Sequence, residues 1–253
     1  MANLEPLIQS IPVAPLKLAS LEGCRTLADQ VNNYLVSFRH ESPTNVGQAD
    51  SLQGYCADSY LLECECPRFG SGEGKGVLKE SVRGCDLFIM VDVANYSLTY
   101  RVNGYENHMS PDNHYQDLKR IISAADGKAR RINVIMPFLY EGRQHKRSKR
   151  ESLDCALMLQ ELVDMGVSNI LTFDAHDPRV SNSIPLHGFD SFMPTYQFLK
   201  ALVNSVPDFV IDNDHLMIIS PDEGAMGRAV YFSNILGVDM GMFYKRRDYS
   251  TVV

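Results

Sequence analysis

Short apolar runs separated by polar residues and glycines recur along the chain. Each run has the length of a strand and is nearly continuous in apolar residues, which is typical of parallel strands covered on both faces. The predicted strands are 87–93, 132–139, 170–174, 216–220 and 238–244.

Helical patterns lie between these runs. Residues 151–165 place leucine and alanine at helical spacings and precede Gly166, and shorter helices are predicted over 25–35, 194–203 and 227–236. The polar stretch 37–59 is interpreted as an insertion or a long loop. Strand and helix in alternation predict a doubly wound α/β fold, and punctuation by glycine, proline and aromatic residues near 184–194 predicts a domain boundary there.

Composition narrows the class of protein. The formal net charge of −7 argues against a general nucleic-acid binder. No run approaches the ~18 apolar residues that span a bilayer, and the N-terminus lacks the pattern of a signal peptide. The six cysteines form no C-x-x-C pair, so we expect reduced structural thiols in a cytoplasmic protein without a membrane partner.

Polar side chains follow three predicted strands, at the sheet edge where open parallel sheets bind ligands. Asp174 and His176 follow one strand, and an extended backbone would point both to one side. Asp222 lies in a Ser-Pro-Asp-x-Gly turn, which by itself is more typical of a connection than of a site. For Asp174 and His176 the competing interpretation is a satisfied polar pair at a strand end.

The third segment is a basic loop within an otherwise acidic protein. Its cationic side chains are Arg143, Lys146, Arg147, Lys149 and Arg150. The loop is either a solvated charge run or an anion site. Its place between a buried strand and a helix N-terminus favours an anion site for polyphosphate.

These motifs, in this order, resemble the ribose-phosphate pyrophosphokinase family. The resemblance covers roughly residues 15–250. The matching segments are Arg68–Glu73 with Glu80–Gly84, Pro137–Arg150, Asp174–His176, Ser220–Gly224 and Lys245 with Arg247.

The resemblance implies tandem phosphoribosyltransferase-type (type I) domains with doubly wound parallel sheets, over residues 1–193 and, incompletely, 194–253. It implies transfer of the diphosphoryl group of ATP to ribose 5-phosphate, with Mg²⁺, in a homo-oligomer such as a dimer or hexamer. The implied ATP-binding residues are Phe69, Glu73, Arg143 and Gln144, the metal ligands His176 and Asp222, and the catalytic residues Lys245 and Arg247. Asp174 is expected to support His176.

The chain also departs from the family pattern. Ser71 replaces the asparagine of the adenine-binding hairpin, and His145 stands where an aspartate is usual. The threonine- and glycine-rich loop that binds the ribose 5-phosphate is missing before Val253, so we expect a fragment that is inactive by itself. The alternative is a non-catalytic regulator that binds nucleotide, and a simple phosphoribosyltransferase is disfavoured because it leaves the ATP motifs unexplained.

Overall fold

A computed structural model describes residues 13–41 and 54–244. The chain divides into two compact units, residues 1–193 and 194–253. The boundary falls between Met193 and Pro194.

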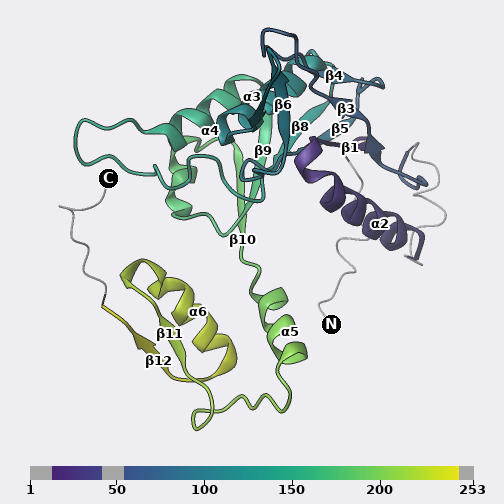
Figure 1. Ribbon diagram of the computed structural model, residues 1–253. Helices are drawn as coiled ribbons and strands as arrows, with labels where there is room; N and C mark the ends of the chain where they lie inside the picture. The colour runs from purple at the N-terminus through teal and green to yellow at the C-terminus, as the bar shows by residue number, and fades with distance from the viewer. Residues whose placement is uncertain (1–12, 42–53, 245–253) are drawn as a thin grey trace. The chain divides into compact units, whose positions relative to one another are not determined.

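The first unit is built on a six-stranded sheet in which all neighbouring strands are parallel (Figure 1). Its order is β10-β9-β8-β5-β1-β2. The strands are β1 (Leu16–Ser20), β2 (Leu61–Leu62), β5 (Asp86–Met90), β8 (Arg131–Ile135), β9 (Val167–Phe173) and β10 (Gly188–Phe192). The parallel, doubly wound arrangement expected from the sequence is therefore present in this unit.

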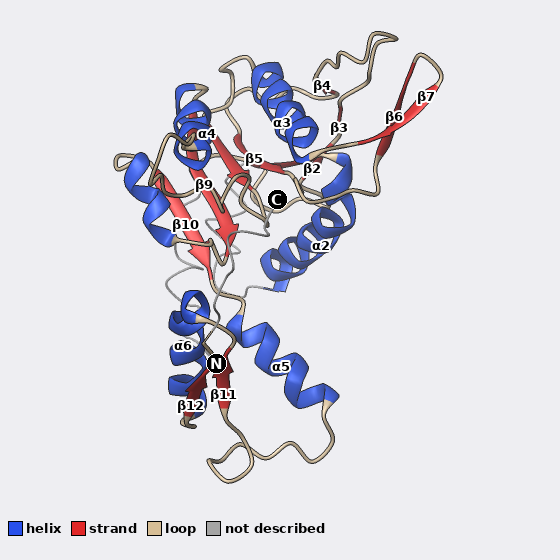
Figure 2. Ribbon diagram, turned by 60° about the vertical axis from the view of Figure 1, so that its left-hand side comes forward, coloured by secondary structure: helices blue, strands red, loops and turns tan. Residues whose placement is uncertain are grey.

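Helices cover both faces of this sheet (Figure 2). On one face, α3 (Pro111–Ala125) and α4 (Asp154–Asp164) pack against alternate residues of the central strands in the larger core, where Leu118 and Leu159 meet Leu87. On the other face, α2 (Arg25–Glu41) forms a smaller core in which Ala28 joins Leu18. Buried apolar surface on both faces explains why these strands lack polar alternation.

Smaller elements surround the sheet. Two antiparallel pairs are present, β3 (Cys64–Glu65) with β4 (Val77–Leu78), and β6 (Thr99–Val102) with β7 (Tyr105–His108). The β6–β7 hairpin turns at Asn103 and Gly104, which both have positive φ, as a two-residue hairpin turn requires. Short 3-10 helices are η1 (Glu22–Cys24) and η2 (Pro178–Ser183).

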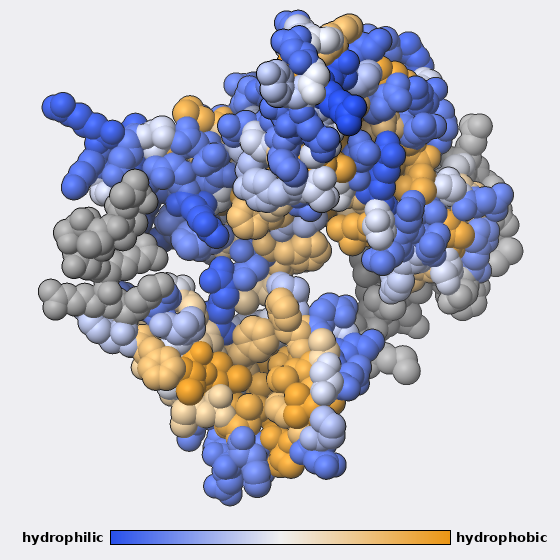
Figure 3. All heavy atoms as spheres, viewed as in Figure 1, coloured by the Kyte–Doolittle hydropathy of each residue, from blue (hydrophilic) through white to orange (hydrophobic). Residues whose placement is uncertain are grey.

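The second unit contains α5 (Thr195–Ser205), β11 (Ile218–Ser220), η3 (Glu223–Ala225), α6 (Met226–Leu236) and β12 (Met240–Met242). Strands β11 and β12 pair in parallel on either side of the α6 crossover. Its surface is rich in apolar side chains, seen in orange in Figure 3 over the region of α6, β11 and β12. Few apolar side chains of its described part are buried, among them Ala229 and Val238.

Each strand and helix predicted from the sequence overlaps an observed element. The interpretation of 37–59 as a loop was wrong in its first part, because α2 continues to Glu41. The sequence pattern missed the β6–β7 hairpin and α3, although α3 has clear end signals. The Ser110 hydroxyl accepts a hydrogen bond from the Asn113 N–H, and Pro111 occupies the first turn.

Among the described residues, no helix is both long and apolar enough to cross a membrane. All six cysteines are free thiols, of which Cys24, Cys64, Cys85 and Cys155 are buried. Burial raises the pKa of Cys64 to about 11, which keeps this thiol protonated and unreactive at neutral pH.

Candidate functional site

The basic loop between β8 and α4 is fastened at its first turn by Gln144. The N–H of Gln144 donates to the carbonyl oxygen of Glu141 at 2.8 Å, and its side-chain amide donates to the carbonyl oxygen of Ser152 at 2.7 Å. The Cys155 N–H donates back to the Gln144 carbonyl oxygen at 3.4 Å. These bonds close the loop onto the start of α4, so Gln144 has a structural role whatever it binds.

This fastening brings the loop beside the residues that follow β9. The rings of His145 and His176 lie 5.1 Å apart between centroids. The Nε2 atom of His145 is 3.6 Å from the Oδ2 atom of Asp177. Two segments about 30 residues apart in sequence therefore meet at the carboxyl edge of neighbouring parallel strands, where ligands of such sheets bind.

Asp177 is an acid of this edge that Arg179 holds firmly. The Arg179 side chain hydrogen-bonds both carboxylate oxygens, and with a smaller contribution from His145 it keeps the pKa of Asp177 well below its ordinary value. The Asp177 carboxylate is therefore negatively charged at neutral pH and lies next to the His145 ring.

Asp174 does not have the extended backbone assumed from the sequence. Strand β9 ends at Phe173, and Asp174 has a φ of 46°, in the left-handed region that aspartate tolerates. Its N–H donates to the Phe192 carbonyl oxygen at 2.9 Å. The expectation that Asp174 and His176 share one side as an extended pair was therefore wrong in its geometry, and the support of His176 by Asp174 stays a prediction.

The cations of the loop point to solvent. Arg143 and the side chains of Lys146, Arg147, Lys149 and Arg150 are all exposed, as is His176. Because these side chains are exposed among the described residues, an anion that docks here keeps part of its hydration. A run of exposed cations beside a helix N-terminus suits a polyphosphate.

Asp222 lies in the second unit, at the start of η3. Its Oδ1 atom accepts a hydrogen bond from the Ala225 N–H at 3.1 Å, so it caps this turn. The hydroxyl of buried Ser220 donates to the Asp222 carbonyl oxygen at 2.7 Å. The turn is built by local bonds, and metal ligation by Asp222 stays a prediction.

Within residues 13–41 and 54–244, no group of three or more histidine, cysteine, aspartate or glutamate side chains is arranged to hold a metal ion. A magnesium ion that arrives with a triphosphate needs only one or two protein ligands, since phosphates and water supply the rest. Lys245 and Arg247, the predicted catalytic residues, lie outside the described residues.

The predicted adenine-binding residues Phe69 and Glu73 lie in the turn between β3 and β4. The Phe69 N–H donates to the Glu73 carbonyl oxygen at 2.7 Å, and the Ser71 hydroxyl donates to Glu73 Oε2 at 2.8 Å. The Phe69 side chain is 53% exposed. A large aromatic ring so exposed on an ordered turn is available to a partner or ligand.

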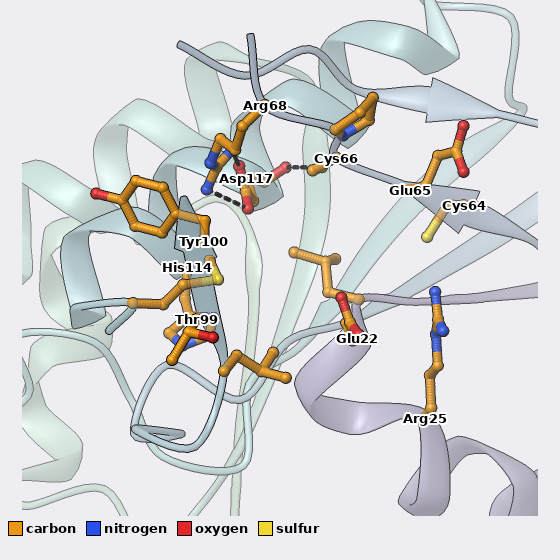
Figure 4. A pocket seen from close by; sticks show the side chains of 14 residues that line it. Glu22, Arg25, Cys64, Glu65, Cys66, Arg68, Thr99, Tyr100, His114 and Asp117 are labelled. Atoms are coloured by element: carbon orange, nitrogen blue, oxygen red, sulfur yellow. Dashed lines mark hydrogen bonds and ion pairs between the residues drawn. The ribbon is translucent and has the colours of Figure 1, made fainter. Parts of the chain in front are cut away.

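This turn is held by Arg68, whose contacts Figure 4 shows. Both terminal nitrogens of Arg68 donate to the Asp117 carboxylate of α3, at 2.6 and 2.8 Å, and its guanidinium lies over the Tyr100 ring at 5.4 Å. The neighbouring cavity has a volume of about 260 Å³ and is lined by residues of η1, β3, β6 and α3. No pattern in the sequence marks Asp117 or Tyr100, because their role depends on which elements become neighbours.

The two groups of predicted ATP-binding residues occupy different places in the first unit. The turn with Phe69 and Glu73 contacts α3 and the β6–β7 hairpin, whereas Arg143 and Gln144 belong to the loop against α4 and β9. Each place carries only part of the predicted residue set.

Comparison with a solved structure defines the class of fold. The crystal structure of phosphoribosylpyrophosphate synthetase from Mycobacterium smegmatis matches 92% of this chain and 65% of that chain, with a TM-score of 0.66 and 22% sequence identity. At this identity the likeness shows the fold, and it confirms the predicted α/β class with parallel sheets.

Sequence comparisons show the family. The family model for the N-terminal domain of ribose phosphate pyrophosphokinase matches residues 16–166, more than half of the chain. The ribose-phosphate pyrophosphokinase of Thermosipho africanus is 31% identical over 76% of this chain and 55% of that protein. That of Staphylococcus saprophyticus is 26% identical over 74% of this chain and 53% of that protein. The chain belongs to the ribose-phosphate pyrophosphokinase family, and it spans about half the length of these curated relatives.

Proposed function

We propose that the whole protein is a ribose-phosphate diphosphokinase, which transfers the diphosphoryl group of ATP to the 1-hydroxyl of ribose 5-phosphate and releases AMP. The observation that supports this most directly is the meeting of the Arg143–His145 loop with His176 at the carboxyl edge of β8 and β9. Both segments carry family motifs, and together they form a cationic, hydrogen-bonding edge suited to a triphosphate.

In this proposal each residue acts by position and charge. Diphosphoryl transfer depends on placing the reactants in line and on neutralising the charge that moves between them. Arg143 and Gln144 hold the triphosphate, and Lys245 and Arg247 stabilise the diphosphoryl group as it leaves the AMP moiety.

Mg²⁺ bound with the triphosphate would supply further neutralisation of charge. His176 and Asp222 are the proposed protein ligands. The carboxylate of Asp222 fits the oxygen preference of Mg²⁺, whereas an imidazole nitrogen such as that of His176 is a softer donor.

We propose a homo-oligomer, at least a dimer, in which the Phe69–Glu73 turn of one chain completes the ATP site of its neighbour. The exposure of Phe69 supports this arrangement, as do the different packing partners of its turn and of the basic loop, which are α3 for the turn and the start of α4 for the loop. Binding of the adenine by a neighbouring chain explains why the predicted ATP-binding residues occupy two separate places within one chain.

The proposal is tested by measuring AMP release from ATP and ribose 5-phosphate with the full-length protein. Arg143→Ala and His176→Ala are each expected to lower turnover by ~10²-fold, the typical loss when one preorganised charge-stabilising group is removed. Arg101→Ala and His187→Ala, exposed residues away from the loop, are the matched controls and should retain activity.

Unchanged turnover in both loop variants, at wild-type melting temperature, contradicts these roles.

A second candidate, a non-catalytic nucleotide-binding regulator, is motivated by Ser71 and His145 at positions where the family has asparagine and aspartate. It predicts ATP binding with no AMP release from the full-length protein under any substrate concentration.

A further inference from the structure

The β6–β7 hairpin has two faces of different character. Tyr100 pairs with Asn107 and Val102 with Tyr105, so these four side chains share one face, because side chains alternate along a strand. The opposite face carries Arg101 and Glu106, an exposed ion pair at 3.8 Å. One face is therefore an ordinary solvated surface, and the other carries two tyrosines.

The tyrosine face is turned toward the Phe69–Glu73 turn. The Arg68 guanidinium, fixed by Asp117, lies over the ring of Tyr100 (Figure 4). At Gly72, whose φ is +91°, a Cβ atom would lie 3.0 Å from a methyl carbon of Val102. The hairpin and the turn therefore lie against each other at two places, at Tyr100 and at Val102.

Between them lies an open hollow of about 580 Å³. Its lining residues are Ser71, Gly72 and Glu73 of the turn and Tyr100, Val102, Asn103, Tyr105 and Asn107 of the hairpin. Tyr100 and Val102 are partly covered, but Tyr105 is 76% exposed although it lies on the face toward the turn. The hollow therefore ends in an aromatic ring that the described residues leave largely uncovered.

We propose that the β6–β7 hairpin is part of the nucleotide-base site and that Tyr105 stacks on the purine whose edge meets Glu73. This inference rests on the proposed binding of ATP and extends it to a residue outside the family motifs. An aromatic ring and a carboxylate that line one hollow match a purine with an exocyclic amino group. The ring covers the face of the base, and the carboxylate accepts from the amino group.

Ser71 orients the Glu73 carboxylate for its contact with the amino group of the base. The Ser71 hydroxyl donates to Oε2 of Glu73 at 2.8 Å, which orients the carboxylate. Ser71 thus acts on the base through Glu73 as a positioning residue, and Tyr105 sets the affinity for the ring itself.

The test separates the contribution of the base to the affinity for ATP from the contribution of the phosphates. Dissociation constants of Mg·ATP and of Mg·tripolyphosphate, which has no base, are measured by calorimetry on the full-length protein at several protein concentrations. Tyr105→Ala is expected to weaken ATP binding about tenfold, as the loss of one base–aromatic stack does, with tripolyphosphate binding unchanged. Tyr105→Phe, which keeps the ring, and Arg101→Ala on the opposite face should bind ATP as the wild type does.

The possible results distinguish a failure of this inference from a failure of the proposed function on which it rests. If Phe69→Ala removes the preference for ATP over tripolyphosphate and Tyr105→Ala leaves it intact, Tyr105 has no role and the inference is overturned, while ATP binding stands. If the wild type binds ATP no better than tripolyphosphate, both the base site and the proposed function fail. Equal melting temperatures exclude unfolding as the cause of a loss.

Discussion

Asp117 holds two arginine side chains at the place where the Phe69–Glu73 turn meets α3. Its carboxylate accepts from Arg68 and from Arg120 Nη1, the latter at 2.6 Å, while only 6% of the Asp117 side chain is exposed. Cys66 Sγ lies 3.7 Å from the carbonyl oxygen of the same residue. One buried acid therefore fixes the turn, and through Arg68 it also fixes Tyr100 of the hairpin.

We predict that Asp117→Asn lowers the free energy of unfolding by about 3 kcal/mol, since it leaves two buried or half-buried cations without their counter-charge. Urea unfolding measures the loss. The matched control is Glu106→Gln, which breaks an exposed ion pair and should change stability by less than about 0.5 kcal/mol. A loss in Asp117→Asn no greater than in the control contradicts a supporting role for this pair.

At the scale of elements, α3 and α4 are joined by a polar bridge above their shared core. The Tyr115 hydroxyl of α3 donates to Glu161 Oε2 of α4 at 2.6 Å, and Lys119 Nζ donates to the other oxygen at 2.8 Å. The Tyr115 ring stacks on Tyr140 with centroids 4.6 Å apart. Since Tyr140 precedes the basic loop, this bridge ties the base of the loop to both helices.

Burial, reinforced by the bond to Glu161, raises the pKa of Tyr115 above its ordinary value. The raised pKa means that the folded state keeps its proton where the unfolded chain has lost it. The stabilisation from Tyr115 is therefore fully present below the unfolded pKa of about 10 and is lost as pH rises through the folded pKa.

We predict that stability falls more steeply between pH 9.5 and 11 in the wild type than in Tyr115→Phe, which cannot ionise. Urea midpoints measured across this range compare the two proteins. Tyr96→Phe, an exposed tyrosine, controls for the general effect of alkaline pH. Parallel pH profiles for the wild type and Tyr115→Phe would show that Tyr115 is not coupled to folding.

At the scale of the whole molecule, the two units differ in how they are stabilised. Among the described residues, the first unit contains the two hydrophobic core clusters and all strands of the six-stranded sheet. The second has a two-stranded parallel sheet and exposes apolar side chains such as Ile219, Ile235 and Phe243. Two strands and one short crossover seldom bury enough surface to offset the loss of chain entropy.

We predict that residues 1–193 expressed alone unfold cooperatively, with a urea midpoint close to that of the longer chain. Residues 194–253 alone should lack a cooperative transition. Circular dichroism during thermal and urea unfolding provides the measurement. A cooperative transition in the isolated second segment, or none in the first, contradicts this division of stability.

The sequence by itself determined the class of fold. Runs such as 87–93 and 132–139 are nearly continuous in apolar residues because both faces of a central parallel strand are covered, and this signal is local. The helix of 151–165 could be predicted for the same reason, from its own periodicity. The motif residues Arg143 and His176 could be named because each follows a strand end that the pattern had already marked.

Only the tertiary structure decided which of these residues meet. Three arrangements join segments far apart in sequence: the approach of His145 to Asp177, the fixing of Arg68 by Asp117, and the lining of one hollow by Tyr105 and Glu73. Such pairings depend on strand order and on which helix covers which face of the sheet. No local periodicity encodes them, because hydrophobic burial specifies what is inside without specifying its neighbours.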